Sequence, residues 1–210
     1  MKIALIADSH LSDTEITPQE ESLNWALEEL ESIAPDACVW LGDITACGAP
    51  EDFRHEQYLL VEEQGKRILC IDCDIGLRNL DISLGMSDTG AISFLDVCEG
   101  GYSLSQAAKH HKFETLSFLT APLNRTAESV DPDGFREMVR AARKEFDYIF
   151  LDAPAGIDAG FELAARYADR CLVVTGADPA AIRDATRAAQ RLELMDKQDV
   201  KLIVNRVSRK

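Results

Sequence analysis

Apolar segments of strand length alternate with segments of helical periodicity along most of the chain. The strand candidates are Lys2–Ala7, Ala37–Leu41, Arg67–Ile71, Thr115–Leu119, Tyr148–Leu151, Arg170–Thr175 and Lys201–Asn205. Several are too continuously apolar for a strand with one face in water, so a sheet covered on both faces is expected. Strands that alternate with helices form βαβ units. The sequence therefore predicts an α/β fold with a doubly wound, mostly parallel sheet flanked by helices.

Three segments between the strand candidates carry an apolar stripe at helical spacing: Glu20–Ile33, Gly134–Glu145 and Pro179–Leu194. The last of them has the clearest beginning. Asp178 is a favourable N-cap residue, and a proline directly after it suits the first helical turn. We therefore expect a helix to begin at Pro179.

The net charge of −15 limits the partners that the chain can have. Non-specific nucleic-acid binding needs clustered Lys and Arg, so no nucleic-acid partner is expected. Adhesion to an anionic bilayer through charge alone is disfavoured for the same reason. No apolar run approaches the roughly 20 residues of a membrane span, and MKIALIADSH lacks the features of a signal peptide. These observations predict a cytoplasmic protein.

The six cysteines do not form a recognisable metal-binding pattern. Cys70 and Cys73 make a CxxC pair, but no second CxxC or CxxH pair completes a tetrahedral zinc set. The pair also lies in the apolar run RILCIDCDIG. We expect small buried side chains in a reducing compartment.

Acidic residues follow the ends of several strand candidates, namely Asp8, Asp43, Asp72 with Asp74, and Asp152. In parallel sheets, ligands bind beyond the carboxyl ends of the strands. The placement therefore indicates a site, although any one of these aspartates could be a loop cap.

The segment GKRILCIDCDIGLRNLDISLG, residues 65–85, places Asp72 at a strand end and Asp74 in the loop that follows. Two such carboxylates can hold hydrated Mg²⁺ and orient a water for attack on a phosphate. Arg78 and Asn79 offer donors at the same rim. Ion pairing within the loop is the alternative interpretation.

The segment FDYIFLDAPAGID, residues 146–158, ends an apolar strand in Asp152, which is the Walker B arrangement that binds Mg²⁺ through water. Gly156 in the following turn would let the backbone approach a γ-phosphate closely. In LIVNRV, Asn205 ends another strand and could pair with an adenine edge, or it could be a turn residue.

Together and in this order, these motifs resemble the MinD branch of the MinD/ParA family of deviant Walker A ATPases. The matching segments are DxDIGLRNLD at 72–81, LDAPAGID at 151–158, VTGADPAAIRDA at 174–185 and VNR at 204–206. The resemblance extends over residues 58–207, about two-thirds of the chain. It implies a P-loop NTPase-like fold of the SIMIBI type and an ATP-dependent homodimer with bound Mg²⁺. It also implies contact with the membrane and with partners that control septum placement.

The resemblance also implies roles for individual residues. Asp72 and Asp74 would belong to switch I, with Asp74 near the attacking water. Asp152 would lie near Mg²⁺ in switch II, and Asn205 and Arg206 would contact the nucleotide. Arg78 and the helix after Arg183-Asp184 would lie near dimer or partner surfaces.

Two features of the family are missing from these 210 residues. The KGGxGKTT loop, whose amides and lysines hold the phosphates, does not occur, and Gly65-Lys66 precedes a strand instead of opening a helix. Charge-assisted phosphate contacts contribute on the order of 1.5–3 kcal/mol each. ATP binding and hydrolysis are therefore expected to be weak or lost. The chain reaches Lys210 without the family's amphipathic membrane helix, so weakened membrane association is expected, with any contact peripheral at the inner face of the cell membrane.

Residues 1–44 resemble the beginning of the calcineurin-like metallophosphoesterases through MKIALIADSHL and VWLGDI. That resemblance implies a divalent metal held by Asp8, His10 and Asp43. The family's later histidine motifs are missing. His110 and His111, in AAKHHKFE, are expected to be solvated.

The likeliest seam in the chain is Cys47–Gln57, where Gly, Pro and charged residues interrupt the periodicity. We expect a metallophosphoesterase-like segment at 1–57 and a MinD-like domain at 58–210. One hypothesis places Lys2–Ala7 in the position of the missing P-loop strand, so that both parts share one sheet. The alternatives are a loosely docked appendage and a misjoined gene product.

Three functions follow from these patterns. The first is a MinD-like nucleotide-switch protein with weak or lost ATPase activity. The second is a non-enzymatic remnant that keeps the partner-binding surfaces of such a protein. The third is a metal-dependent phosphoesterase.

Overall fold

The computed structural model of the chain describes residues 4–7, 38–41, 66–87, 90–111 and 113–205. The chain divides into two compact units. One contains residues 61–168, and the other contains residues 1–60 together with 169–210. The predicted domain limits, 1–57 and 58–210, were set by the family that each segment resembles and not by spatial contacts. They stay a prediction.

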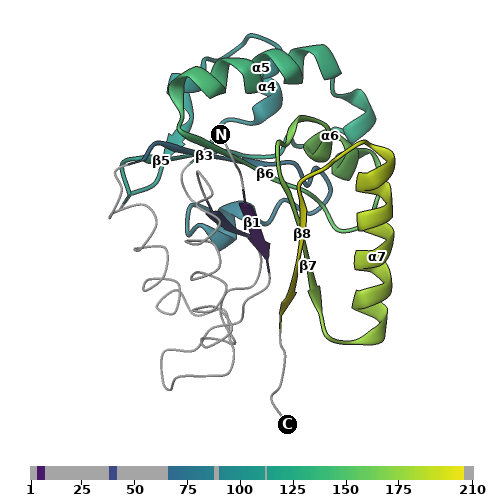
Figure 1. Cartoon of the computed structure of the whole chain (residues 1–210). Coiled ribbons are helices and arrows are strands. Elements are labelled where there is room, and N and C mark those ends of the chain that lie inside the picture. Colours follow the sequence, from purple (N-terminus) through teal and green to yellow (C-terminus); the bar gives the residue numbers. More distant parts are fainter. Residues whose placement is uncertain (1–3, 8–37, 42–65, 88–89, 112, 206–210) are drawn as a thin grey trace, which may run out of the picture. The chain divides into compact units, whose positions relative to one another are not determined.

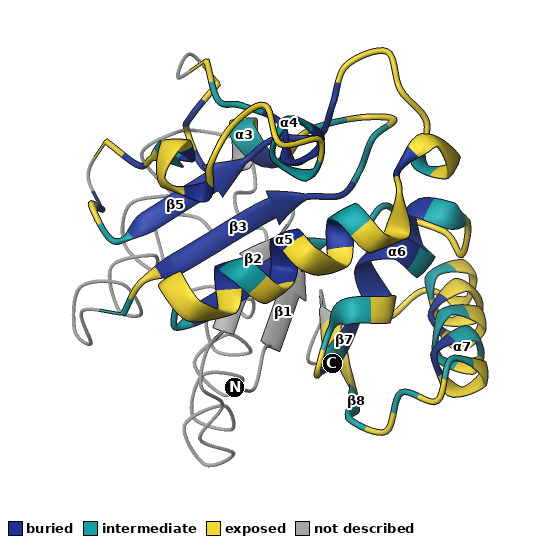
Figure 2. Ribbon diagram, turned by 90° about the horizontal axis from the view of Figure 1, so that it is seen from above, coloured by how far each residue is buried: buried dark blue, intermediate teal, exposed yellow. Residues whose placement is uncertain are grey.

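The 61–168 unit is built on a sheet with the strand order β4-β5-β3-β6. Its strands are β3 (Ile68–Asp72), β4 (Ala108–Lys109), β5 (Leu116–Leu119) and β6 (Tyr148–Asp152). β3 pairs in parallel with β5 on one side and β6 on the other, while the short β4 runs antiparallel to β5. Every residue of β3 and β5 is buried, as Figure 2 shows in dark blue. Burial on both faces explains why these strands are continuously apolar in sequence.

Helices α4 (Phe94–Cys98) and α5 (Pro132–Glu145) lie together over one face of this sheet (Figure 1). α5 buries the stripe Phe135, Met138, Val139 and Ala142 and exposes its charged face. The rings of Phe94 and Phe135 meet edge to face with centroids 5.4 Å apart. The unit also contains α3 (Leu80–Ser83) and α6 (Ala159–Tyr167), with 3-10 turns at Leu104–Gln106 and Ala127–Ser129.

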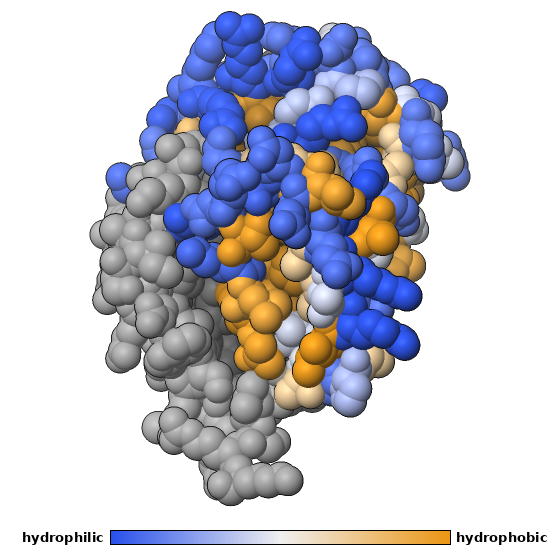
Figure 3. Space-filling model, turned by 45° about the vertical axis from the view of Figure 1, so that its right-hand side comes forward, coloured by the Kyte–Doolittle hydropathy of each residue, from blue (hydrophilic) through white to orange (hydrophobic). Residues whose placement is uncertain are grey.

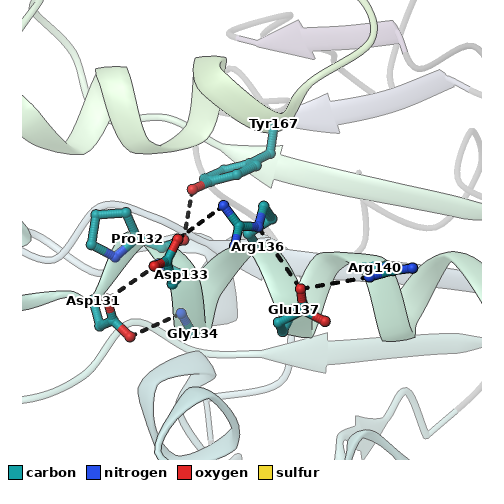
Figure 4. Close-up of polar contacts among 8 residues, drawn as sticks. All are labelled: Asp131, Pro132, Asp133, Gly134, Arg136, Glu137, Arg140 and Tyr167. Atoms are coloured by element: carbon teal, nitrogen blue, oxygen red, sulfur yellow. Dashed lines mark hydrogen bonds and ion pairs between the residues drawn. The ribbon is translucent and has the colours of Figure 1, made fainter.

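The beginning of α5 is fixed by backbone and side-chain contacts (Figure 4). The Asp131 carboxylate accepts hydrogen bonds from the amides of Asp133 and Gly134, and Pro132 occupies the first turn. The Tyr167 hydroxyl, from the end of α6, donates to the Pro132 carbonyl over 2.6 Å. Further along, ion pairs among exposed residues of α5 contribute little to stability. The cap and the tyrosine therefore set where this helix begins.

The other unit contains β7 (Cys171–Gly176), α7 (Pro179–Leu194) and β8 (Val200–Asn205), and β7 and β8 pair in parallel. The Asp178 carboxylate accepts from the amides of Ala180 and Ala181, which confirms the predicted beginning of α7. In the same unit, β1 (Ala4–Ala7) pairs in parallel with β2 (Cys38–Leu41), and β1 lies against β7.

The predicted α/β class with a mostly parallel sheet and flanking helices is confirmed. The helix expected from Gly134 begins at Pro132, and α3, α4, α6 and the two-residue β4 were not predicted. The helix expected at Glu20–Ile33 lies outside the described residues. Cys70 and Cys73 are free and buried, as predicted.

Candidate functional site

The last residues of β3 and β6 place two carboxylates side by side at the carboxyl edge of the sheet. Asp72 and Asp152 are partners in the parallel register of these strands. The amide that follows Asp72, that of Cys73, donates to the Asp152 carbonyl over 2.8 Å. The structure thus brings together the two carboxylates that the sequence assigned to separate strand ends.

Asp72 organises the loop that follows it. Its Oδ1 accepts a hydrogen bond from the Asp74 amide at 2.9 Å, and its Oδ2 accepts one from the Leu80 amide at 3.3 Å. The residue has 0% of its surface exposed. Both carboxylate oxygens therefore bind the chain's own backbone, and Asp72 holds the loop between β3 and α3 in place.

Asp74 closes a second, smaller turn within that loop. Its Oδ1 accepts hydrogen bonds from the amides of Gly76 and Leu77 at 3.1 and 3.0 Å. Arg78, whose amide donates to the Asp74 carbonyl, has a φ of 52° and so lies in the left-handed region that non-glycine residues rarely adopt. Such strain is commonly stored in loops that carry function.

The close approach of carboxylates at a buried edge alters their protonation. Burial, followed by the charges of Asp72 and Asp74, raises the pKa of Asp152 from 3.8 to about 8. Burial also raises the pKa of Asp72 to about 6, although the amide donors from Asp74 and Leu80 oppose the rise. A hard cation such as Mg²⁺ prefers carboxylate oxygens and would favour the ionised forms. The type of side chain at this edge suits a cation, although within the described part of the chain no group of three or more such side chains could hold one.

The two described loops at this edge offer little positive charge to a triphosphate. In the loops 73–79 and 153–158, Arg78 is the one cationic side chain. Lys66, the lysine of the Gly-Lys dipeptide, comes two residues before Ile68, where β3 begins. At about 3.3 Å per residue, the four steps of this strand separate Ile68 from Asp72 by roughly 13 Å, which keeps Lys66 away from Asp72.

Gly156 lies in the exposed loop after β6 with a φ of +103°. An L-residue there would be strained although a Cβ would meet no atom within 4 Å. The predicted role of Gly156 in letting a phosphate approach is compatible with this open position and stays a prediction.

Gly160, in the first turn of α6, is required for a close approach between that helix and the site loops. A Cβ at this position would lie 2.8 Å from Pro154 Cγ and 3.4 Å from the Cys73 carbonyl oxygen. We expect Gly160→Ala to lower the stability by about 1–2 kcal/mol despite the better helix propensity of alanine. Denaturant unfolding would measure the loss. Adding Pro154→Ala should recover part of it, and equal stability of the wild type and the single variant would contradict the packing explanation.

The remaining predicted site residues belong to the other compact unit. Asn205 ends β8 in the other compact unit, where it pairs in register with Gly176. Arg206 lies outside the described residues, and so do the predicted metal ligands Asp8, His10 and Asp43. Among the described residues, no group of three or more His, Cys, Asp or Glu side chains could hold a metal ion. The roles assigned to these residues stay predictions.

The prediction that both histidines of AAKHHKFE are solvated is wrong for one of them. His110 is 5% exposed, and its ring bonds to backbone groups on both sides, whereas His111 is exposed. A charged sequence around a histidine gives no indication of contacts made with residues 26 positions away. His110 is therefore a buried residue that sequence reasoning missed.

Comparison with solved structures places this fold in the MinD/ParA class of P-loop NTPase folds. No family model matches the chain. Septum site-determining protein MinD of Bacillus subtilis is 38% identical over 147 residues, which cover 68% of this chain and 54% of the relative. MinD of Helicobacter pylori is 37% identical over 153 residues, covering 69% of this chain and 57% of the relative. The chain spans about half the length of the curated relatives it matches.

Solved structures that resemble this chain are also MinD proteins. MinD of Aquifex aeolicus matches with a TM-score of 0.59 and 35% identity, covering 69% of this chain and 58% of that one. A chain of the MinC:MinD complex of Aquifex aeolicus matches with a TM-score of 0.61 and 37% identity, with the same coverage. MinD of Pyrococcus horikoshii with Mg-ADP covers 99% of this chain and 72% of its own at 21% identity and a TM-score of 0.59, which shows the fold alone.

The predicted resemblance to the MinD/ParA family is confirmed by these matches, and the specific proteins that the matched segment resembles are MinD proteins. The matches to MinD proteins do not test whether residues 1–44 are related to the metallophosphoesterases. The resemblance of residues 1–44 to that family stays a prediction.

Proposed function

We propose that the chain is a MinD-like protein of bacterial division-site placement in which ATP binding and hydrolysis are weak or lost. The observation that carries the proposal is the pairing of Asp72 with Asp152 at the carboxyl edge, within a segment 38% identical to a MinD protein over 147 residues. A non-enzymatic, partner-binding remnant of MinD is the alternative.

The proposed loss of ATP affinity rests on the chemistry of the edge. A triphosphate carries several negative charges, and the edge holds the acidic residues Asp72, Asp74 and Asp152, while the loops 73–79 and 153–158 contain no lysine to balance them. The Arg78 side chain supplies one positive charge. Mg²⁺ could bridge a carboxylate to a phosphate, because oxygen ligands suit this ion. ATP with Mg²⁺ is therefore the cofactor proposed, held weakly.

The proposed partners are division regulators and a second copy of the chain. One solved neighbour is a MinD protein in complex with MinC. Large apolar side chains are also exposed in helix α3 and in the loops that follow β3, β5 and β6. They are Leu77 at 74%, Ile82 at 65%, Leu123 at 69% and Ile157 at 45% exposed. Figure 3 shows one face of the molecule, on which hydrophobic side chains reach the surface among hydrophilic ones. Apolar surface of this kind, rimmed by polar groups, is typical of protein–protein interaction sites.

The proposed location is the cytoplasm, with peripheral contact at the inner face of the cell membrane. Among the described residues, none of the helices is long and apolar enough to cross a bilayer. The charge of −15 opposes binding to anionic lipid, so protein partners would have to bring the chain to the membrane.

Binding to a MinC protein from the source organism would test the division role. We expect saturable binding of the purified 210-residue chain to immobilised MinC, with an affinity that changes less than about threefold when Mg-ATP is added. The MinD of Bacillus subtilis, assayed with the MinC of its own organism, serves as the control for the assay. Binding that requires Mg-ATP would overturn the proposed loss of nucleotide affinity, and a lack of binding with or without it would overturn the division role.

A further inference from the structure

Strand β8 lies at an open edge of its sheet (Figure 1). Within the described part of the chain it pairs with β7 alone, in a continuous parallel register over Val200–Asn205. The unpaired amides and carbonyls of an edge strand form a template for another strand, and proteins usually protect such edges with proline, charges or bulges. This strand contains no proline, and Lys201 is its one charged residue. β8 is therefore an edge with little protection against strand pairing.

The direction of the backbone groups in β8 follows from its bonds to β7. The Cys171 amide donates to the Asp199 carbonyl over 2.9 Å, so Asp199 directs its carbonyl toward β7. Backbone groups of successive residues alternate between the two sides of a strand. Those of Val200 therefore face the open edge, as do those of Leu202 and Val204. Leu202 is 60% exposed and Val204 is 41% exposed. The residues that offer free backbone groups thus also expose apolar side chains.

We propose that β8 pairs in antiparallel orientation with β8 of a second copy of the chain, about a twofold axis that passes beside Leu202. Leu202 then lies opposite the same residue of the second copy, and Val200 lies opposite Val204 on both sides of the axis. All of these residues direct their backbone groups toward the added strand, so each pair exchanges two hydrogen bonds, about six bonds in all. Their side chains share one face of the combined sheet and cover one another.

The opposite face of the paired strands also fits this axis. Lys201 lies across from Ile203 of the second copy, so the stem of the lysine meets an apolar side chain and no like charges are opposed. An axis at Lys201 would instead place the two ammonium groups opposite each other. An axis at Ile203 would leave Val200 without a partner in β8. The sequence of the strand therefore selects Leu202 as the position of the axis.

A twofold contact of this kind joins two chains and closes, because each chain then has its β8 edge occupied. The net charge of −15 on each chain opposes association over a longer range. Added salt screens that repulsion, so the association should strengthen with ionic strength. The inference goes beyond the proposed function, since the pairing needs neither a nucleotide nor a division regulator.

Sedimentation velocity of the 210-residue chain measures this association directly. We expect the mass to rise with concentration from one chain to two, with a dissociation constant on the order of 10 µM. Raising the salt from about 0.05 M to about 0.5 M should strengthen the association several-fold. Mg-ATP should change the dissociation constant less than about twofold, because the β8 edge makes no contact with it. A wild-type chain that remains monomeric at about 200 µM, or that associates only with Mg-ATP, would overturn the proposal.

Variants at the axis test the geometry of the pairing. Leu202→Lys and Leu202→Glu each place two like charges opposite one another, so each should weaken the association at least about tenfold. An equal mixture of the two variants places Lys opposite Glu and should restore most of the association. Leu194→Lys is the matched control, because Leu194 lies on α7 and is 79% exposed. It adds the same charge away from the strand and should associate as the wild type does. Equal weakening by Leu194→Lys, or a mixture that stays monomeric, would contradict the axis at Leu202.

Hydrogen exchange of the wild type decides the question even if the Leu202 variants fail to fold. The amides of Leu202 and Val204 face the open edge, so their protection should rise about tenfold between dilute and concentrated protein. The Ile203 amide faces β7 and should be protected at every concentration. Protection of the Leu202 amide that does not depend on concentration would identify another segment of the same chain as the occupant of the edge. Protection that is absent at every concentration would show that the edge stays open. Either result would overturn pairing with a second copy.

Discussion

Replacing Asp152 by asparagine should raise the melting temperature of the protein at pH 8, although the change removes a carboxylate from the candidate site. Burial and the neighbouring charges of Asp72 and Asp74 raise the pKa of Asp152 to about 8, so its ionised form is disfavoured in the folded state. Asparagine has nearly the same shape and no charge. The expected gain at pH 8 is about 2 kcal/mol, less than a shift of this size alone would give, because burying the amide also costs free energy.

The pH dependence of this gain follows from linkage. The folded state binds a proton at Asp152 more tightly than the unfolded state, where the ordinary pKa is 3.8. The stability that this proton contributes is fully present below about pH 4 and is lost as the pH rises through about 8. The difference between the variant and the wild type should therefore be small at pH 4.5 and large at pH 8. Thermal unfolding in buffers of equal ionic strength would measure it.

Asp158→Asn is the matched control for that experiment. Asp158 is exposed, lies in the same loop and makes no side-chain cap bond to α6. Its replacement should change the melting temperature little at either pH. A destabilised Asp152→Asn protein at pH 8 would show that the carboxylate makes favourable contacts that outweigh its desolvation.

Replacing Arg170 by methionine should lower the stability by about 2 kcal/mol, because it breaks an ion pair whose arginine is buried although Asp199 keeps 35% of its side chain exposed. Arg170 Nε lies 2.7 Å from Oδ2 of Asp199, and the arginine side chain is 6% exposed. The pair joins the beginnings of β7 and β8, where the Cys171 amide also donates to the Asp199 carbonyl. Denaturant unfolding would measure the loss.

The double variant Arg170→Met with Asp199→Leu separates the attraction of the pair from the penalty of an uncompensated charge. We expect the double variant to recover more than half of the lost stability, since apolar residues often replace buried ion pairs without cost. Arg136→Met is the control, because Arg136 pairs with Asp133 at the surface and its removal should cost less than about 1 kcal/mol. An Arg170→Met protein as stable as the wild type would contradict the buried-pair interpretation.

The strands and the acidic edge could be predicted from the sequence because they depend on local patterns. Continuously apolar stretches such as β3 and β6 are recognisable without knowing what covers them. An aspartate after each stretch then predicts two carboxylates at one edge of a parallel sheet, and the register pairs Asp72 with Asp152. The family motifs add a resemblance that the relatives confirm.

The contacts that the sequence could not predict join residues that are far apart in the chain. α3 is too short for a recognisable apolar stripe, and its ends bond to the distant residues Asp72 and His110 in addition to burying Leu80. The burial of His110 depends on a carbonyl from α3 and an amide after β4, which no periodicity encodes. The pKa of Asp152 likewise depends on charges from another strand and its loop.

The central claim is that the chain has the acidic edge of a nucleotide-binding site but binds ATP weakly or not at all. Isothermal titration calorimetry of the full chain with Mg-ATP tests this claim most directly. We predict no saturable binding at ATP concentrations up to about 1 mM, which corresponds to a binding free energy weaker than about −4 kcal/mol. The MinD of Bacillus subtilis, titrated under the same conditions, would serve as the control. Saturable binding with a dissociation constant near 10 µM or below, abolished by Asp152→Asn or Asp74→Asn, would contradict the prediction.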